Sequence, residues 1–412
     1  MEKKMQEIKL LRKFGEKFGI ATDAKLYFAP GRVNLIGEYT DYNGGYVLPC
    51  GLSIGTYAVA SRRTDQKIKL YSMNCESEEV IEIELSNIKN FFKKLWTSYP
   101  LGVMKNMIDH GYEIPSGINM LVYGDLPIGA GVGSSASLEI LSALVVKDLY
   151  WLDDLTMKEM ALICQEAEHR YIGKKCGIMD QFTVARSRRN YAMLLNTKNL
   201  SFKRIPLILE DSKIVIINTC VNHSKKKEAY NHRRNECEKA LEDLQKVINV
   251  HQLCDLSVTD FEEYKKYIQN DTVRKRAEHV VYENMRTLAA AKALEEGDLI
   301  KLGMLMKASH CSLKNKFEVS CKELDFLTEM AWEYDGVIGA RMTGGGFGGS
   351  TVNIVKTEKL EAFIVTLKQA YFKEFGIDFQ FFMAEVSDGA YVRLSQIDLA
   401  EKLEEKKHFR KN

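Results

Sequence analysis

A glycine-rich segment between an expected strand and an expected helix constrains this chain more than any other feature. An apolar strand pattern covers Ile118–Tyr123, and an apolar helix pattern runs from about Ser135 to Leu149. Between them, residues 127–136 read PIGAGVGSSA, with glycine at 129, 131 and 133. Glycines let backbone N–H groups turn toward a ligand, and the start of the following helix carries a partial positive charge. The segment therefore predicts a cradle for a polyphosphate.

Two common nucleotide-binding motifs do not fit this segment. A Walker A loop needs a lysine after its last glycine. The Rossmann fingerprint G-x-G-x-x-G, counted from Gly129, lacks its third glycine, because Ser134 stands at that position. Instead Ser134 and Ser135 follow, whose hydroxyls can cap the helix, while one of them can also be a ligand of Mg²⁺. Gly344–Gly349 does match G-x-G-x-x-G, but a strand pattern follows where a Rossmann motif must open a helix. A simple serine-capped turn remains the alternative for residues 127–136.

A second helix pattern places a carboxylate on a buried face. Met157, Ala161, Cys164 and Glu168 follow one another at spacings of four, three and four, which puts them on one side of a helix over residues 157–171. A buried carboxylate is costly in free energy unless a positive group meets it. The pattern therefore indicates a cation near Glu168, either a bound metal ion or a neighbouring arginine or lysine.

Length and charge limit the class of protein. The chain has 412 residues, enough for two or three domains, and a change to charged helical sequence after Arg204 places a boundary near residue 206. We expect two α+β domains, residues 1–205 and 206–412, with a cleft between them. A net charge of +2 gives no positive electrostatic field over the whole molecule that would attract nucleic acid. The N-terminal residues MEKKMQEIKL lack the apolar core of a signal peptide. The nine cysteines include no C-x-x-C pair, which is typical of reduced thiols. Together these features predict a cytoplasmic enzyme without a nucleic-acid or membrane partner. They leave the oligomeric state open, and a monomer is plausible.

The segment Ala29–Gly45, APGRVNLIGEYTDYNGG, concentrates polar chemistry in a short turn. Carboxylates such as Glu38 and Asp41 accept paired hydrogen bonds from vicinal hydroxyls, which is a common way to bind a sugar. Arg32 and the apolar residues after it argue against the alternative, a solvated acidic turn. The segment is therefore a candidate sugar site.

This segment resembles the sugar signature of the galactokinases, a family of GHMP small-molecule kinases, in which Arg32, Glu38, Asp41 and Asn43 would surround a sugar. Four further segments are similar to that family in the same order: residues 127–136, CGIMDQF at 176–182, EVSCKELD at 318–325 and TGGGFGG at 343–349. The resemblance implies the two-domain GHMP kinase fold, with the active site in the cleft between the domains. It also implies ATP-dependent phosphorylation of a hexose at the anomeric hydroxyl, with galactose as the expected substrate and Mg²⁺ as the cofactor.

Residue roles are carried over from the same resemblance. Asp180 would be the general base, and Arg32 beside it would keep that carboxylate ionised and stabilise the transferred phosphoryl group. Ser135 and Glu168 would hold Mg²⁺. The sugar-contacting set would be Arg32, Glu38, Tyr39, Asp41, Gly177 through its backbone, Asp180 and Tyr230. The ATP-contacting set would be Trp96, Tyr99, Pro127, Gly129, Gly131, Gly133, Ser134, Ser135 and Ala136.

Plainer interpretations stay open for several of these residues. Asp180 also fits a helix or turn cap, and Tyr230 fits a core or helix-surface position. Trp96 and Tyr99, three residues apart on an expected helix, also fit an ordinary core.

Two positions depart from the family pattern. Tyr39 stands where galactokinases usually have histidine, and its bulkier phenol would reshape the pocket if it faces the sugar. Gly133 stands where many galactokinases have serine, and in this respect the loop is more similar to that of other GHMP kinases. Two alternatives are a kinase for another hexose, such as N-acetylgalactosamine, and a galactose- and ATP-binding regulator without catalysis. Because the expected catalytic and metal-binding residues are all present, they argue against the regulator.

Overall fold

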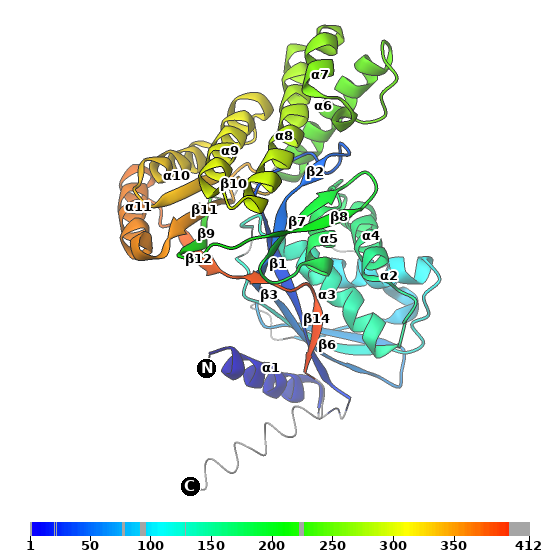
Figure 1. The fold of residues 1–412 in the computed structure, drawn as a ribbon. Helices are drawn as coiled ribbons and strands as arrows, with labels where there is room; N and C mark the ends of the chain where they lie inside the picture. The colour runs from blue at the N-terminus through cyan, green and yellow to red at the C-terminus, as the bar shows by residue number, and fades with distance from the viewer. Residues whose placement is uncertain are drawn as a thin grey trace.

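The computed structural model describes residues 2–19, 21, 23–75, 79–90, 96–127, 129–221 and 226–394. These residues form sheets and helices in two halves, with a helical arm at one end (Figure 1). No helix among them is long and apolar enough to cross a bilayer.

The first sheet comes mainly from the N-terminal half. Its strand order is β14-β1-β3-β6-β4-β5, with β13 also paired to β3. The pairings are antiparallel except that of β4 with β6. The strands are β1 (Lys25–Asn34), β3 (Pro49–Arg62), β4 (Lys67–Ser72), β5 (Ile81–Glu84), β6 (Ile118–Gly124), β13 (Val386–Ser387) and β14 (Tyr391–Leu394).

Alternation along β1 explains why helices cover both faces of this sheet. Leu26 and Phe28 pack in a core with α1 (Glu2–Phe18), whereas Tyr27 and Ala29 pack in the core under the other helices, because successive side chains of a strand point to opposite faces. The helices on the second face are α2 (Ser98–Asp109), α3 (Ser134–Leu149), α4 (Met157–Ala167) and α5 (Met179–Arg186) (Figure 1).

The helix predicted over residues 157–171 changes its pitch where Glu168 lies. α4 ends at Ala167, and a π-helical turn, η2 (Glu168–Ile172), continues it until Gly173 ends the turn in the left-handed region. Cys164 and Glu168 are both buried, as the spacing predicted. The residues after this turn lead to the start of α5.

The second sheet, β10-β11-β9-β12, is antiparallel throughout. Along β9, Val215 and Ile217 pack under α10 and α11, while Ile214 and Ile216 pack in the core shared with α9 and the first half. The strands are β9 (Ser212–Asn218), β10 (Val337–Thr343), β11 (Ser350–Lys356) and β12 (Gln380–Ala384), and the helices are α9 (Leu299–Ser312), α10 (Lys322–Glu333) and α11 (Leu360–Phe375).

The helical arm is built from charged amphipathic sequence, as predicted for this part of the chain. Its helices are α6 (Lys226–Gln245), α7 (Val258–Tyr264) and α8 (Asp271–Glu295), at the top of Figure 1. Short helical turns complete the described chain: η1 (Leu85–Asn90), η3 (Leu253–Asp255), η4 (Lys265–Tyr267), η5 (Leu313–Phe317) and η6 (Thr357–Lys359).

The proposed boundary near residue 206 falls between β8 (Phe202–Pro206) and β9. Before it, a small third sheet joins β2 (Tyr46–Val47), β7 (Tyr191–Asn196) and β8. Beyond it, the chain crosses back, since β13 and β14 pair with strands of the first sheet. The division into residues 1–205 and 206–412 stays a proposal, and the returning strands tie its two parts together.

Candidate active site

A cavity of about 460 Å³ lies where the two halves meet. Its walls come from the turn after β1, the glycine-rich loop before α3, the segment before α5, the start of α6 and the loop between β10 and β11. The predicted site residues that line it are Arg32, Glu38, Tyr39, Asp41, Tyr99, Gly129, Gly131, Gly133, Ser134, Ser135, Glu168, Gly177, Asp180 and Tyr230. The other predicted residues, Trp96, Pro127 and Ala136, lie outside this lining.

Arg32 and Asp180 form a buried ion pair in the cavity wall. Arg32 lies near the end of β1, and Asp180 lies in the first turn of α5. Arg32 Nε donates to Asp180 Oδ1 at 2.7 Å and Nη2 donates to Oδ2, while Nη1 donates to the Gly131 carbonyl. Burial acts to raise the pKa of Asp180, but the charges of Arg32 and Lys174 hold it below its ordinary value. Asp180 is therefore an ionised acceptor at neutral pH.

The glycine-rich loop takes its shape from backbone that favours glycine. Gly129, Gly131 and Gly133 have φ of 75°, 73° and 78°. Gly133 is the N-cap of α3, with no side-chain cap. The predicted serine cap is therefore wrong, and Ser135 is free to hydrogen-bond elsewhere.

The loop between β10 and β11 packs against the glycine-rich loop before α3. A Cβ atom added to Gly344 would lie 2.6 Å from the Gly131 carbonyl oxygen, so the close approach requires glycine. The Gly344 N–H donates to Glu38 Oε1 at 3.1 Å. Two glycine-rich loops and the turn after β1 thus surround one space.

Glu38 joins the turn after β1 to the C-terminal half. Its carboxylate accepts a hydrogen bond from Asn34 Nδ2 at 2.9 Å and pairs with the fully buried Arg341 at 2.5 Å, in addition to Gly344. Burial raises the pKa of Glu38 to about 7, and nearby Glu283 adds to this while Arg341 opposes it. These contacts hold Glu38 rigidly in the wall.

Asp41 packs directly on the backbone of Gly177. A Cβ atom added to Gly177 would lie 1.9 Å from Asp41 Oδ2. Burial and the charge of Asp180 raise the pKa of Asp41 to about 6, although the backbone N–H of Met179 acts in the opposite direction. Asn43, which the family pattern placed around the sugar, instead donates to the Tyr39 carbonyl at 2.8 Å and supports the turn.

The rings of Tyr39 and Tyr230 form another wall of the cavity, and Phe317 packs behind Tyr39. The Tyr39 ring lies 5.4 Å from the Tyr230 ring and 4.4 Å from the Phe317 ring, measured between centroids. The two aromatics predicted to lie near adenine have different surroundings. Tyr99, in the first turn of α2, lines the cavity, whereas Trp96, in the turn before α2, packs against the helical core.

Hydrogen-bond donors surround the Glu168 carboxylate. Oε1 accepts from Ser135 Oγ at 3.1 Å and from Lys174 Nζ at 3.4 Å. Oε2 accepts from Cys176 Sγ and from Gln181 Nε2, both at 2.9 Å. Lys174 is thus a positive partner of the kind predicted for Glu168. The Ser135 hydroxyl and the Glu168 carboxylate also offer the oxygen ligands that a nucleotide-bound divalent cation prefers, so the donor set fits such an ion.

Lys174, Gln181 and Arg341 were missed by the sequence analysis. Burial acts to lower the pKa of Lys174, but Glu168, Cys176 and Asp180 together raise it above its ordinary value, so the ammonium stays charged. The position of Lys174 just before the motif at 176–182 was the available signal.

The comparisons with known proteins place the chain in a family. The chain matches the galactokinase galactose-binding signature over residues 12–62, the GHMP kinase N-terminal domain over 98–188 and the GHMP kinase C-terminal domain over 290–373. It is 44% identical to a galactokinase of Clostridium beijerinckii over 93% of this chain and 99% of that protein. It is 42% identical to a galactokinase of Bacillus subtilis over 92% of this chain and 95% of that protein.

Solved structures show the same fold. The crystal structure of Lactococcus lactis galactokinase complexed with galactose matches with a TM-score of 0.92 and 39% identity, over 94% of this chain and all of that one. A mevalonate kinase structure, at 20% identity and a TM-score of 0.64, covers 88% of this chain and 99% of its own and shares the fold. The predicted α+β GHMP kinase fold is therefore confirmed.

Proposed function

The chain belongs to the galactokinase family of GHMP kinases, and we propose that this enzyme transfers the γ-phosphoryl group of ATP to the anomeric hydroxyl of galactose inside the cavity. The observation that carries the proposal is the ion pair of Arg32 with Asp180. Through Arg32 Nη1 and the Gly131 carbonyl, this pair joins the wall of the expected sugar pocket to the glycine-rich loop. A hydroxyl and a polyphosphate bound on the two sides would meet beside the Asp180 carboxylate.

The nucleotide side is assigned to the loop before α3. Backbone N–H groups of Gly129–Ser135 and the positive end of α3 would hold the phosphates. Tyr99 would lie along the adenine. Its backbone N–H donates to the Trp96 carbonyl at 3.2 Å, and the Trp96 side chain packs against the helical core. Pro127 and Ala136 flank the loop and would fix where it begins and ends.

A divalent cation accompanies ATP in kinases, and we assign it as Mg²⁺ held by Ser135 and Glu168. Bound there, it would neutralise charge that develops on the phosphates. Gln181 and Lys174 hold the Glu168 carboxylate in place for this role, and α3 holds Ser135.

On the sugar side, Asp180 would orient the anomeric hydroxyl and accept its proton. A carboxylate with a lowered pKa is a weak base toward an alcohol, so the proton transfers as the new O–P bond forms and the bond from phosphorus to ADP breaks. Arg32 keeps Asp180 ionised until the carboxylate accepts this proton. The remaining sugar hydroxyls would meet the other members of the predicted set: Glu38, Tyr39, Asp41, the backbone of Gly177, and Tyr230.

The test is ADP release by the purified protein over a panel of galactose, N-acetylgalactosamine, 2-deoxygalactose and glucose, with NMR of the product. Turnover of galactose with phosphate on the anomeric oxygen is expected. Turnover of N-acetylgalactosamine alone would assign another hexose, and binding of both ligands without ADP release would identify a regulator. The proposed cytoplasmic location is tested by cell fractionation.

A further inference from the structure

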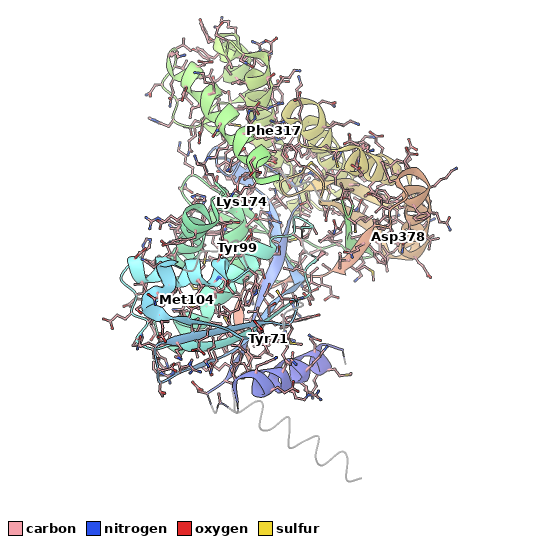
Figure 2. All side chains as sticks on the ribbon, turned by 180° about the vertical axis from the view of Figure 1, so that it is seen from behind. Tyr71, Tyr99, Met104, Lys174, Phe317 and Asp378 are labelled. Carbon is pink, nitrogen blue, oxygen red and sulfur yellow. The ribbon has the colours of Figure 1, made fainter. Side chains whose placement is uncertain are left out.

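Lys174 lines the cavity, yet the family pattern gives it no role in the reaction. It follows Gly173, which ends the turn η2, and its side chain is 30% exposed. Figure 2 labels it near the centre of the molecule, between the layer that carries Tyr99 and the part that carries Phe317. Lys174 is therefore at the junction of the two halves, where substrates would meet.

The backbone beside Lys174 is fixed to the helical arm. The N–H of Lys175 donates to Asn231 Oδ1 at 3.2 Å, and its carbonyl accepts from Arg234 Nη1 at 3.0 Å. Lys175 is exposed and lies outside the cavity lining. Two consecutive lysines thus have different surroundings, and Lys174 is the one held toward the cavity.

The Lys174 ammonium lies next to the expected end of the polyphosphate. Its acceptor, Glu168 Oε1, is the same oxygen that accepts from Ser135 Oγ. Ser135 is the second residue of α3, at the positive end of the helix dipole and directly after the loop glycines. The Lys174 ammonium and the loop expected to bind phosphates therefore lie side by side in the cavity wall.

The other cations at the cavity have shorter hydrogen bonds to the protein than Lys174 has. Arg32 uses all three of its nitrogens on Asp180 and Gly131, and Lys227 Nζ donates to the Ile172 carbonyl at 3.0 Å. Among the described residues, Lys174 Nζ has one hydrogen-bond acceptor, at the long distance of 3.4 Å. An ammonium has three N–H donors, so donors remain for a ligand.

We propose that the Lys174 ammonium binds the terminal phosphate of the nucleotide, an inference that rests on the proposed ATP-dependent sugar kinase activity. The carboxylates that line the cavity are Glu38, Asp41, Glu168 and Asp180. A polyphosphate entering among them needs compensating positive charge, and Arg32 is committed to Asp180. Lysine binds phosphate as a point charge on a flexible stem, so it can turn from Glu168 to the phosphate without moving the backbone.

Calorimetric binding of ATP, ADP and AMP tests the proposal, with Mg²⁺ present and separately with EDTA. Lys174→Met is expected to weaken ATP binding by about 10-fold or more, the effect of losing one charge-assisted hydrogen bond, and to leave AMP binding unchanged. Lys174→Arg is expected to restore part of the loss. Lys175→Met, which removes the adjacent exposed charge, is the matched control and should bind like the wild type.

The double variant Lys174→Met with Glu168→Gln separates a direct role from an indirect one. If Lys174 only neutralises Glu168, its effect on ATP affinity vanishes once Glu168 is uncharged, and the proposal is overturned. An equal loss for AMP, which lacks the β- and γ-phosphates, overturns it as well. Thermal unfolding of each variant shows that the fold is kept, and Lys174→Gln replaces Lys174→Met if it is not.

A wild-type protein that binds ATP but phosphorylates no sugar would contradict the proposed function while leaving this binding role standing.

Discussion

The Tyr39 hydroxyl donates a 2.5 Å hydrogen bond to the carbonyl oxygen of Gly345, a residue 306 positions further along the chain. Tyr39 itself has a φ of 70°, in the left-handed region that bulky residues rarely adopt. Contacts with Phe317 and Tyr230 hold the ring in this place. One side chain therefore links the turn expected to hold the sugar to the glycine-rich loop between β10 and β11.

Asp180→Asn is expected to lower kcat by ~10²–10⁴, because the amide cannot accept the proton of the sugar hydroxyl. Galactose and ATP binding, measured by calorimetry, should change little, since the amide keeps the shape of the carboxylate. Asp154→Asn, at an exposed position before α4, is the matched control. Turnover near the wild-type rate in the Asn variant would rule out Asp180 as the base.

Glu168→Gln is expected to raise the Mg²⁺ concentration required for half-maximal rate, because one charged ligand is lost. Ser135→Ala should shift the titration in the same direction by a smaller amount. Glu166→Gln, two residues earlier in α4 and paired with His110 and Arg170, is the control. If the Mg²⁺ titration of Glu168→Gln matches that of the control, Glu168 serves only as the partner of Lys174.

Galactose affinity is expected to fall as the pH drops through 6. The pKa of Asp41 is about 6 because burial and Asp180 disfavour its charge, so the carboxylate is ionised above this pH and protonated below it. The ionised form is the stronger acceptor for sugar hydroxyls. For one such group the Kd should rise by up to about 10-fold between pH 7 and pH 5.

The same titration on Asp41→Asn supplies the control for this pH effect. Asp180 stays ionised over that range because its pKa is lowered, so it contributes no step. The variant should bind galactose more weakly and should lose the step near pH 6. A full pH dependence in the variant would assign the effect to another group, such as Glu38, whose pKa is about 7.

The parts of the site that could be predicted are those carried by contiguous motifs. The segments at 29–45, 127–136 and 176–182 all contribute to one cavity. The pairing of Arg32 with Asp180, 148 positions apart, followed from the family resemblance, because spacing along a chain carries no information about contacts between distant segments. The predicted serine cap of α3 was wrong because the N-cap is Gly133, whose backbone lies in the left-handed region.

Tertiary contacts account for what could not be predicted. Nothing near Glu38 in the sequence indicates that Arg341 will meet it, or that β14 will return to pair with β1. These contacts exist only once both halves have folded together. Lys174 was overlooked because a lysine in a loop is usually solvated, and its surroundings are set by the π-helical turn before it.

Tyr39 is expected to contribute to selectivity among hexoses, because its ring lines the cavity while its hydroxyl is committed to Gly345. Tyr39→His shortens the side chain and opens that wall, so it should change the kcat/KM of galactose relative to its 2-acetamido and 2-deoxy analogues by about 10-fold. Tyr39→Phe keeps the ring and removes only the link to Gly345. It should therefore retain the wild-type ratios, with a loss shared by every sugar.

Tyr42→Phe, in the same turn with its ring edge-on to Tyr39, is the control. If the values for all sugars move together in Tyr39→His, the ring acts only in packing, and the departure from histidine has no part in choosing the substrate.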